Sequence, residues 1–232
     1  MKNKENIISY RGVNTNLSYF ILRKIIGYSG LLLPLLCWAI TRQCETSISY
    51  YYYTRSGVVF TSILTLCGVF LISYRGEEED KERLSTNIIT WIAGGFLILV
   101  AFVPTPFGEN CPEDCSPTAF FHCSNALGLV HFVSAVIFFV CMGYISIFRF
   151  RGKKKAEKLP KKIRHIIYLV CGIMMWVVLV FAGFMIYIIK INLDGHFIFW
   201  IEVVLLFFFG ISWLVKGKAL VDFGLQAEDN EP

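Results

Sequence analysis

The sequence predicts an all-α polytopic membrane protein, a bundle of six transmembrane helices with both termini in the cytoplasm. Hydrophobic residues make up 56% of the 232 residues and charged residues only 17%, a balance far from that of a soluble domain. The apolar residues fall in long continuous runs and lack the alternating pattern of a β-barrel strand. No Pro/Gly/Ser-rich linker divides the chain, so we expect one domain.

Six segments are apolar and long enough to cross a hydrocarbon core about 30 Å thick as helices, which satisfy their own backbone hydrogen bonds. The predicted spans are 25–41, 56–74, 87–103, 125–148, 163–191 and 197–215. Pro104 and Pro106 are expected to end the third span, because proline cannot continue a helix. We expect residues 1–24 to form a cytoplasmic or interfacial segment, 104–124 an exoplasmic loop with cysteines, and 216–232 a cytoplasmic tail.

The basic residues predict the orientation of the bundle, because cytoplasmic loops of membrane proteins retain positive charge. Nineteen of the 22 Lys and Arg residues lie in the N-terminal segment, the second-to-third or fourth-to-fifth connection, or the C-terminal tail. The remaining three, Arg42, Arg55 and Lys190, lie on the opposite side. We therefore expect a multi-pass protein of the plasma membrane, such as a bacterial inner membrane. This topology explains the net charge of +5, so we expect membrane lipids and no nucleic acid as partners.

The eight cysteines divide by their position in this topology. Four lie within spans, where cysteine is usually a small packing residue: Cys37, Cys67, Cys141 and Cys171. Four lie in exoplasmic connections, on the oxidising side where disulfides persist: Cys44, Cys111, Cys115 and Cys123. Three pairings are open to the second set, and we expect one bridge from Cys44 to the long loop and one within that loop. The alternative is a zinc site of Cys111, Cys115, Cys123 and His122, whose spacing is compatible with zinc.

Two ionisable residues stand out well inside the predicted spans, where an unpaired charge is costly and marks a functional hypothesis. At about 1.5 Å per residue, His131 lies about 9 Å and Glu202 about 7 to 8 Å below the outer ends of their helices. The segment SISYYYYTR reaches the membrane at the same side. We expect an outward-facing polar pocket, with Arg55 turned either inward toward Glu202 as an ion pair or outward toward a lipid phosphate. Its predicted ligand-binding residues are His131, Glu202, Arg55, Tyr51, Tyr52 and Ser49.

Such a pocket favours a protein that binds or senses a lipid headgroup or a small ligand. The main alternative is a membrane-embedded, lipid-modifying enzyme that uses a metal held by His122, His131 and His196, with Glu202 or Asp194 as a ligand or general base. A third interpretation is structural, with His131 and Glu202 only joining adjacent helices.

Two further functions receive less support from the sequence. A serine hydrolase with Ser47 or Ser49 and His131 is conceivable, but the sequence has no GxSxG motif. A proton-coupled transporter would need polar groups through the whole membrane, and the inner half of this chain is almost wholly apolar. We assign no cofactor and no catalytic residue at this point, and the sequence does not indicate an oligomeric state.

Five strings stand out together in the chain: SISYYYYT, GVFLISYRG, AGGFLILVAFVPT, VHFVSAVIFF and FWIEVVLLFFFGISWLVKG. They are spread over residues 47–217, which is most of the chain, and together they resemble a group of uncharacterised bacterial six-span integral membrane proteins. The plan of six spans, both ends inside and a histidine early in the fourth span is also similar to DRAM/Frag-type six-span membrane proteins. The second resemblance implies lipid-related and autophagy-related roles, and neither resemblance implies a reaction.

Overall fold

The computed structural model describes residues 15–76, 85–103, 105, 125–151, 159–190 and 195–219, and every regular element in this part of the chain is helical. The α-helices are α1 (Thr15–Thr41), α2 (Gly57–Ser73), α3 (Thr86–Phe102), α4 (Asn125–Tyr144), α5 (Leu159–Phe184) and α6 (Phe197–Lys216). A 3₁₀ helix, η1 (Ile48–Tyr53), lies between α1 and α2. Short π-helical turns, η2 (Ile145–Arg149) and η3 (Met185–Ile189), extend α4 and α5.

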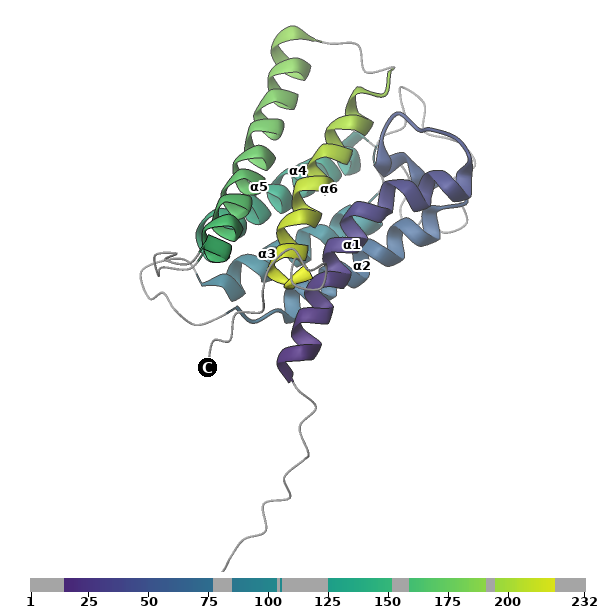
Figure 1. Cartoon of the computed structure of the whole chain (residues 1–232). Helices are drawn as coiled ribbons and strands as arrows, with labels where there is room; N and C mark the ends of the chain where they lie inside the picture. The colour runs from purple at the N-terminus through teal and green to yellow at the C-terminus, as the bar shows by residue number, and fades with distance from the viewer. Residues whose placement is uncertain are drawn as a thin grey trace, which may run out of the picture.

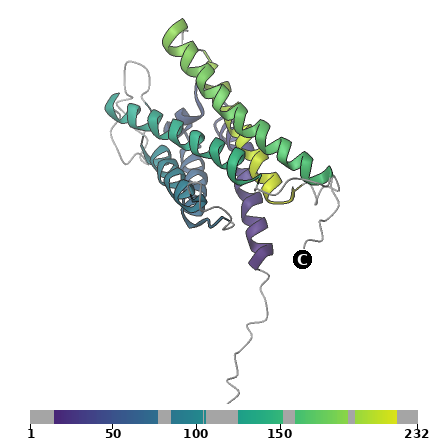
Figure 2. The ribbon, with the colours of Figure 1, turned by 90° about the vertical axis from the view of Figure 1, so that its left-hand side faces the viewer.

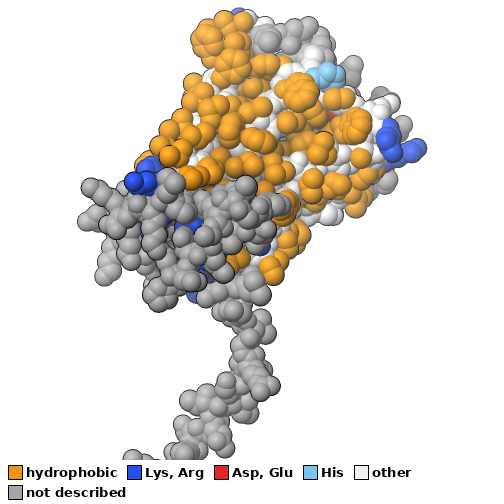
Figure 3. All heavy atoms as spheres, viewed as in Figure 1, with side chains coloured by type: hydrophobic (Ala, Val, Ile, Leu, Met, Phe, Trp, Pro, Cys, Tyr) orange, Lys and Arg blue, Asp and Glu red, His pale blue; other side chains and the backbone are white. Residues whose placement is uncertain are grey.

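Four helical segments are long and apolar enough to cross a membrane: Tyr19–Thr41, Ala126–Arg149, Lys161–Ile189 and Phe197–Lys216. Helices α2 and α3 are also apolar but have 17 residues each. Figure 3 shows a face covered largely by hydrophobic side chains, with Lys and Arg at its edges. Leu66 is 60% exposed and Val180 is 73% exposed. An apolar surface of this extent is that of a membrane protein, because soluble proteins rarely expose large contiguous apolar patches.

Helices form at each of the six predicted spans, but two features differ from the prediction. Helix α1 begins at Thr15, whereas the first span was expected from residue 25, so part of the expected N-terminal segment is helical. The connection from Ser47 to Thr54 contains a helix of its own, η1. The sequence predicted only that this connection leads into the second span. This 3₁₀ helix packs where α1, α2 and α6 meet.

Two pairs of helices approach each other through glycines (Figure 1). Helix α2 packs along α3, and a Cβ added at Gly94 would lie 2.5 Å from the carbonyl oxygen of Gly68. Helix α1 packs along α6, and a Cβ added at Gly210 would lie 2.7 Å from the carbonyl oxygen of Gly27. Since neither position has room for a side chain, these glycines set the distance between the helices.

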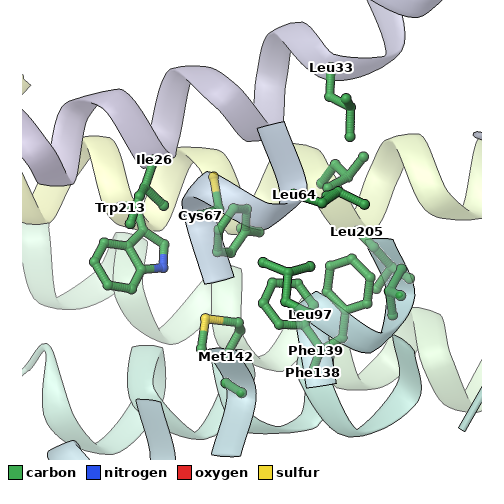
Figure 4. Packing of buried hydrophobic residues seen from close by; sticks show 14 of the residues in the cluster. Ile26, Leu33, Leu64, Cys67, Leu97, Phe138, Phe139, Met142, Leu205 and Trp213 are labelled. Atoms are coloured by element: carbon green, nitrogen blue, oxygen red, sulfur yellow. The ribbon is translucent and has the colours of Figure 1, made fainter. Parts of the chain in front are cut away.

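The core runs along the bundle between these pairs. Helix α5 lies on the outer side against α4 and α6, away from α1 and α2 (Figures 1 and 2). Buried side chains from several helices meet in the centre, and Trp213 lies toward one end of this cluster, next to Ile26 (Figure 4). The opposite end of the bundle, beside η1, is where the polar side chains gather.

Candidate functional site

The 3₁₀ helix η1 begins at a serine cap. Ser47 has an extended backbone, and its Oγ accepts a hydrogen bond from the backbone N–H of Ser49 at 3.1 Å. At the other end, the N–H of Thr54 donates to the carbonyl oxygen of Tyr51 at 3.1 Å. A serine in this position satisfies a backbone donor that the first turn of a helix leaves without an internal partner.

Tyrosine hydroxyls hold η1 against neighbouring segments. The Tyr51 hydroxyl donates to the carbonyl oxygen of Gln43 at 3.0 Å, and the Tyr53 hydroxyl donates to that of Thr105 at 2.6 Å. Burial raises the pKa of Tyr51 to about 12, so its hydroxyl keeps its proton at neutral pH and remains a donor. The tyrosine run therefore positions η1 in addition to lying near the membrane interface.

Glu202 binds the beginning of η1 from another helix. The N–H of Phe199 donates to the carbonyl oxygen of Thr46 at 3.0 Å, which brings the first turn of α6 beside η1. The Ser47 hydroxyl then lies 3.0 Å from Oε1 and 2.9 Å from Oε2 of Glu202, and the backbone N–H of Ile48 donates to Oε2 at 2.6 Å. A carboxylate that accepts several donors at a helix N-terminus is stabilised by those bonds and by the helix dipole.

His131 joins η1 to the end of α3. Its Nδ1 lies 2.7 Å from the carbonyl oxygen of Val103, and its Nε2 lies 2.9 Å from Oγ of Ser49. A carbonyl oxygen only accepts, so the neutral ring carries its proton on Nδ1 and leaves Nε2 as an acceptor. The histidine is only 5% exposed.

Ser49 is the residue at which the two ionisable side chains meet. Its Oγ lies 2.9 Å from His131 Nε2 and 3.3 Å from Glu202 Oε1. The two residues predicted to share a depth in the membrane thus lie on either side of one serine of η1. Counting residues along two helices placed them at one level, but the serine between them comes from a third segment.

Arg55 and the two predicted tyrosines occupy places that differ from the expectation. Arg55 is exposed. Glu202 lies within hydrogen-bond distance of two serine hydroxyls and a backbone N–H, and these two described residues, Arg55 and Glu202, do not form an ion pair with each other. Tyr51 and Tyr52 are buried, at 0% and 3% exposed, and they pack outside the cavity described below. Tyr50 lines that cavity instead. The turn at the start of α2 directs Arg55 outward, which was the second of the two orientations that the sequence left open.

The predicted metal ligands do not form a cluster in the described residues. That part of the chain holds no group of three His, Cys, Asp or Glu side chains placed to bind one ion. His131 contacts Ser49, whereas Nδ1 of His196 lies 3.0 Å from the carbonyl oxygen of Glu45. His122 and Asp194 lie outside the described residues.

Of the four cysteines expected to form disulfides, only Cys44 lies among the described residues. Cys44 is exposed and carries a free thiol, with no disulfide partner among the described residues. Its three expected partners, Cys111, Cys115 and Cys123, lie outside the described residues, and so do all ligands of the alternative zinc site. The four cysteines within the helices are also free thiols, as expected for packing residues.

A cavity of about 640 Å³ extends from η1 into the bundle. The polar side chains among its described lining residues come from η1 and its flanks, from the segment after α3, from the first two turns of α4 and α6 and from η3: Thr46, Ser47, Ser49, Tyr50, Thr105, His131, Tyr187 and Glu202. The remaining wall is apolar and is formed by residues such as Leu64, Leu97, Phe138 and Leu205 (Figure 4). Along α4 the lining runs from Gly128 to Phe139, about 16 Å at 1.5 Å per residue. The cavity is thus polar at one end and apolar along its length.

No family model matches the chain, and neither a curated protein nor a solved structure matches it. The resemblance drawn from the sequence strings remains a prediction. A function for this protein is therefore argued from the geometry of the polar end and its cavity.

Proposed function

We propose that the protein binds an amphiphile inside the membrane, with the apolar chain in the cavity and the polar end at Ser49, His131 and Glu202. The observation that carries this proposal is the separation of polar from apolar side chains along one cavity. Its volume of about 640 Å³ falls in the range of small-molecule pockets, roughly 300–1,000 Å³. A ligand that is polar at one end and apolar along its length matches such a wall.

The polar end favours a head that donates hydrogen bonds. The described lining residues include no Lys or Arg, and they include the Glu202 carboxylate. A phosphate beside Glu202 would meet repulsion that no described cation of this wall offsets. The oxygens of Glu202 and Ser49 accept hydrogen bonds, so a hydroxyl or ammonium head suits the site. The ligand class is a single-chain lipid whose head carries hydroxyl or ammonium groups and no phosphate.

The proposal includes the topology predicted from charge: six spans, both termini cytoplasmic, in a plasma membrane such as a bacterial inner membrane. Helices α2 and α3 have 17 residues each, at the lower limit of about 17 for a span. With this orientation the polar end of the cavity lies in the exoplasmic half, where a lipid of the outer leaflet would enter. The proposed function is therefore lipid binding or sensing from that side.

Photolabelling with a defined lipid tests the binding. Purified protein in detergent is incubated with a monoacylglycerol that carries a diazirine in its acyl chain, irradiated and mapped by peptide mass spectrometry. We expect adducts on apolar residues of the cavity such as Leu97, Phe138 and Leu205. Adducts confined to the outer, membrane-facing side chains would contradict the proposal.

Two glycines provide a matched pair of variants. A Cβ at Gly183 or at Gly95 would meet no atom within 4 Å, so both positions accept a side chain, but only Gly183 lines the cavity. We expect Gly183→Phe to lower photolabelling at least about tenfold, which corresponds to about 1.4 kcal/mol. Gly95→Phe should label as the wild-type protein does. Equal labelling of both variants would show that the lipid binds elsewhere.

A further inference from the structure

We infer that the protein is also a serine esterase, in which Ser49 is the nucleophile and His131 the general base. The substrate class is a fatty acyl ester of a hydroxylated alcohol, held in the cavity as proposed above. This inference rests on that binding function, because the cavity must bring the ester to Ser49. In this reaction the lipid bound in the cavity is hydrolysed.

The geometry is that of an activated serine. Nucleophile and base lie within hydrogen-bond reach at 2.9 Å, and the base is oriented by a third group. Because the carbonyl oxygen of Val103 accepts the Nδ1 proton of His131 at 2.7 Å, the neutral ring has no proton on Nε2. Ser49 has one hydroxyl proton and two acceptors, Nε2 at 2.9 Å and Glu202 Oε1 at 3.3 Å. Donation along the shorter contact, to Nε2, is the arrangement that precedes proton transfer.

The orienting group is itself held by backbone structure. The N–H of Val103 donates to the carbonyl oxygen of Leu99 at 2.8 Å, at the C-terminal end of α3. The carbonyl of Val103 fixes the tautomer and the orientation of the His131 ring, as the aspartate does in a Ser-His-Asp triad. Ser49 and His131 are 7% and 5% exposed, and both line the cavity. They are shielded from bulk water and accessible to a ligand in the cavity.

The reaction balances with water as the only co-reactant. Ser49 Oγ forms a bond to the ester carbonyl carbon while its proton moves to His131 Nε2. The bond to the alcohol oxygen then breaks, and the leaving alcohol takes that proton. A water molecule attacks the acyl-serine through the same histidine, which releases the fatty acid and returns the proton to Ser49. The hydroxyl of the departing alcohol is the donor that the polar end accommodates.

The site has few free donors for the oxyanion that forms on the carbonyl. Near Ser49, the N–H of Ile48 donates to Glu202 and the N–H of Ser49 donates to Ser47. Loss of one oxyanion donor lowers turnover by about 10² to 10³ in well-studied hydrolases. We therefore expect slow turnover, and a single covalent event is the better readout.

A long-chain alkyl fluorophosphonate tests the nucleophile in the full-length protein. Attack by Ser49 Oγ forms an O–P bond, fluoride leaves, and the proton moves to His131. We expect a phosphonyl adduct on Ser49 of the wild-type chain, located by peptide mass spectrometry. We expect its rate of formation to fall at least about 100-fold in His131→Gln, since a general base contributes about 10² to 10⁴.

Controls separate the nucleophile from the fold and from lipid binding. Ser49→Ala should lose the adduct, while Ser56→Ala should keep it, because Ser56 is buried in the same connection but lies outside the cavity. The position of the adduct in the wild-type chain does not depend on any variant folding. An adduct elsewhere, or none while diazirine labelling of the cavity persists, would overturn the esterase and leave the binding function standing. Loss of both kinds of labelling in the wild-type protein would overturn both.

Discussion

The two ends of the helical bundle differ in how they accommodate polar side chains. At the η1 end, Ser47, Ser49, His131 and Glu202 contact one another and backbone groups through directed hydrogen bonds, beside an open cavity. At the opposite end, Trp213 is 1% exposed and packs among aromatic rings. The centroids of its nearest partners lie 5.2 to 6.3 Å away: Phe70, Tyr74, Phe150 and Phe209.

Two arginines, Arg23 at one end of the bundle and Arg55 at the other, also differ in their surroundings. Arg23, at the Trp213 end, is 5% exposed, and its guanidinium carbon lies 5.4 Å from the ring centroids of both Tyr19 and Tyr74. Arg55, at the η1 end, is exposed. Aromatic rings pack around Trp213, whereas the hydrogen-bonded end borders the cavity. We therefore expect the Trp213 end to determine stability and the η1 end to determine lipid binding.

The largest expected effect is on stability at the aromatic end. Trp213→Ala removes a buried indole and leaves a cavity, so we expect the free energy of unfolding to fall by about 3 to 5 kcal/mol. Trp213→Phe should lose less because it keeps a ring. Unfolding by added SDS in mixed micelles measures both. If folded Trp213→Phe lost lipid photolabelling, the proposed division between the two ends would be wrong.

The second largest effect is expected for substitutions of Glu202, which should lower both the stability of the fold and lipid binding. Glu202→Leu leaves the Ser47 hydroxyl and the N–H of Ile48 without their acceptor, which should cost about 1 to 3 kcal/mol. Glu202→Gln keeps one acceptor oxygen and should lose less stability. Both variants should label weakly with the diazirine lipid. A Glu202→Leu variant as stable as the wild-type protein would show that this carboxylate does not hold η1.

The smallest effects distinguish the two arginines. Arg23→Ala removes a cation beside aromatic rings and should cost about 0.5 to 2 kcal/mol. Arg55→Ala changes an exposed side chain, so stability should stay within about 0.5 kcal/mol and photolabelling should not change. The same unfolding and labelling assays apply. Loss of labelling in Arg55→Ala would restore this residue to the binding site.

The helices were predictable from the sequence because their cause is local. A run of apolar residues without charge needs internal backbone hydrogen bonds in a membrane, wherever the rest of the chain lies. The start of α1 at Thr15 was less evident, since residues 15–24 mix apolar side chains with Arg23 and Lys24. Four of the helical segments are long and apolar enough to cross a membrane. Helices α2 and α3 are shorter, so the count of six spans remains a prediction.

The site was predictable only in part. His131 and Glu202 could be placed at one depth because the rise of a helix per residue is constant. Their partners could not be assigned, because the orientation of Ser49 and Arg55 depends on the path of the connection between α1 and α2. A serine followed by four tyrosines indicates an interface at the membrane, but it does not reveal a 3₁₀ helix capped by Ser47.

The sequence by itself thus indicated the membrane class and the positions of the helices, and it predicted one common depth for two ionisable side chains. These properties follow from hydrophobicity and from helix geometry within single segments. The packing of the helices in space decided that Ser49 lies between His131 and Glu202, that Arg55 points outward, and that a cavity lined by residues of all six helices extends from η1. The contacts at Ser49 and Glu202 join residues 82 to 155 positions apart, which no local pattern specifies.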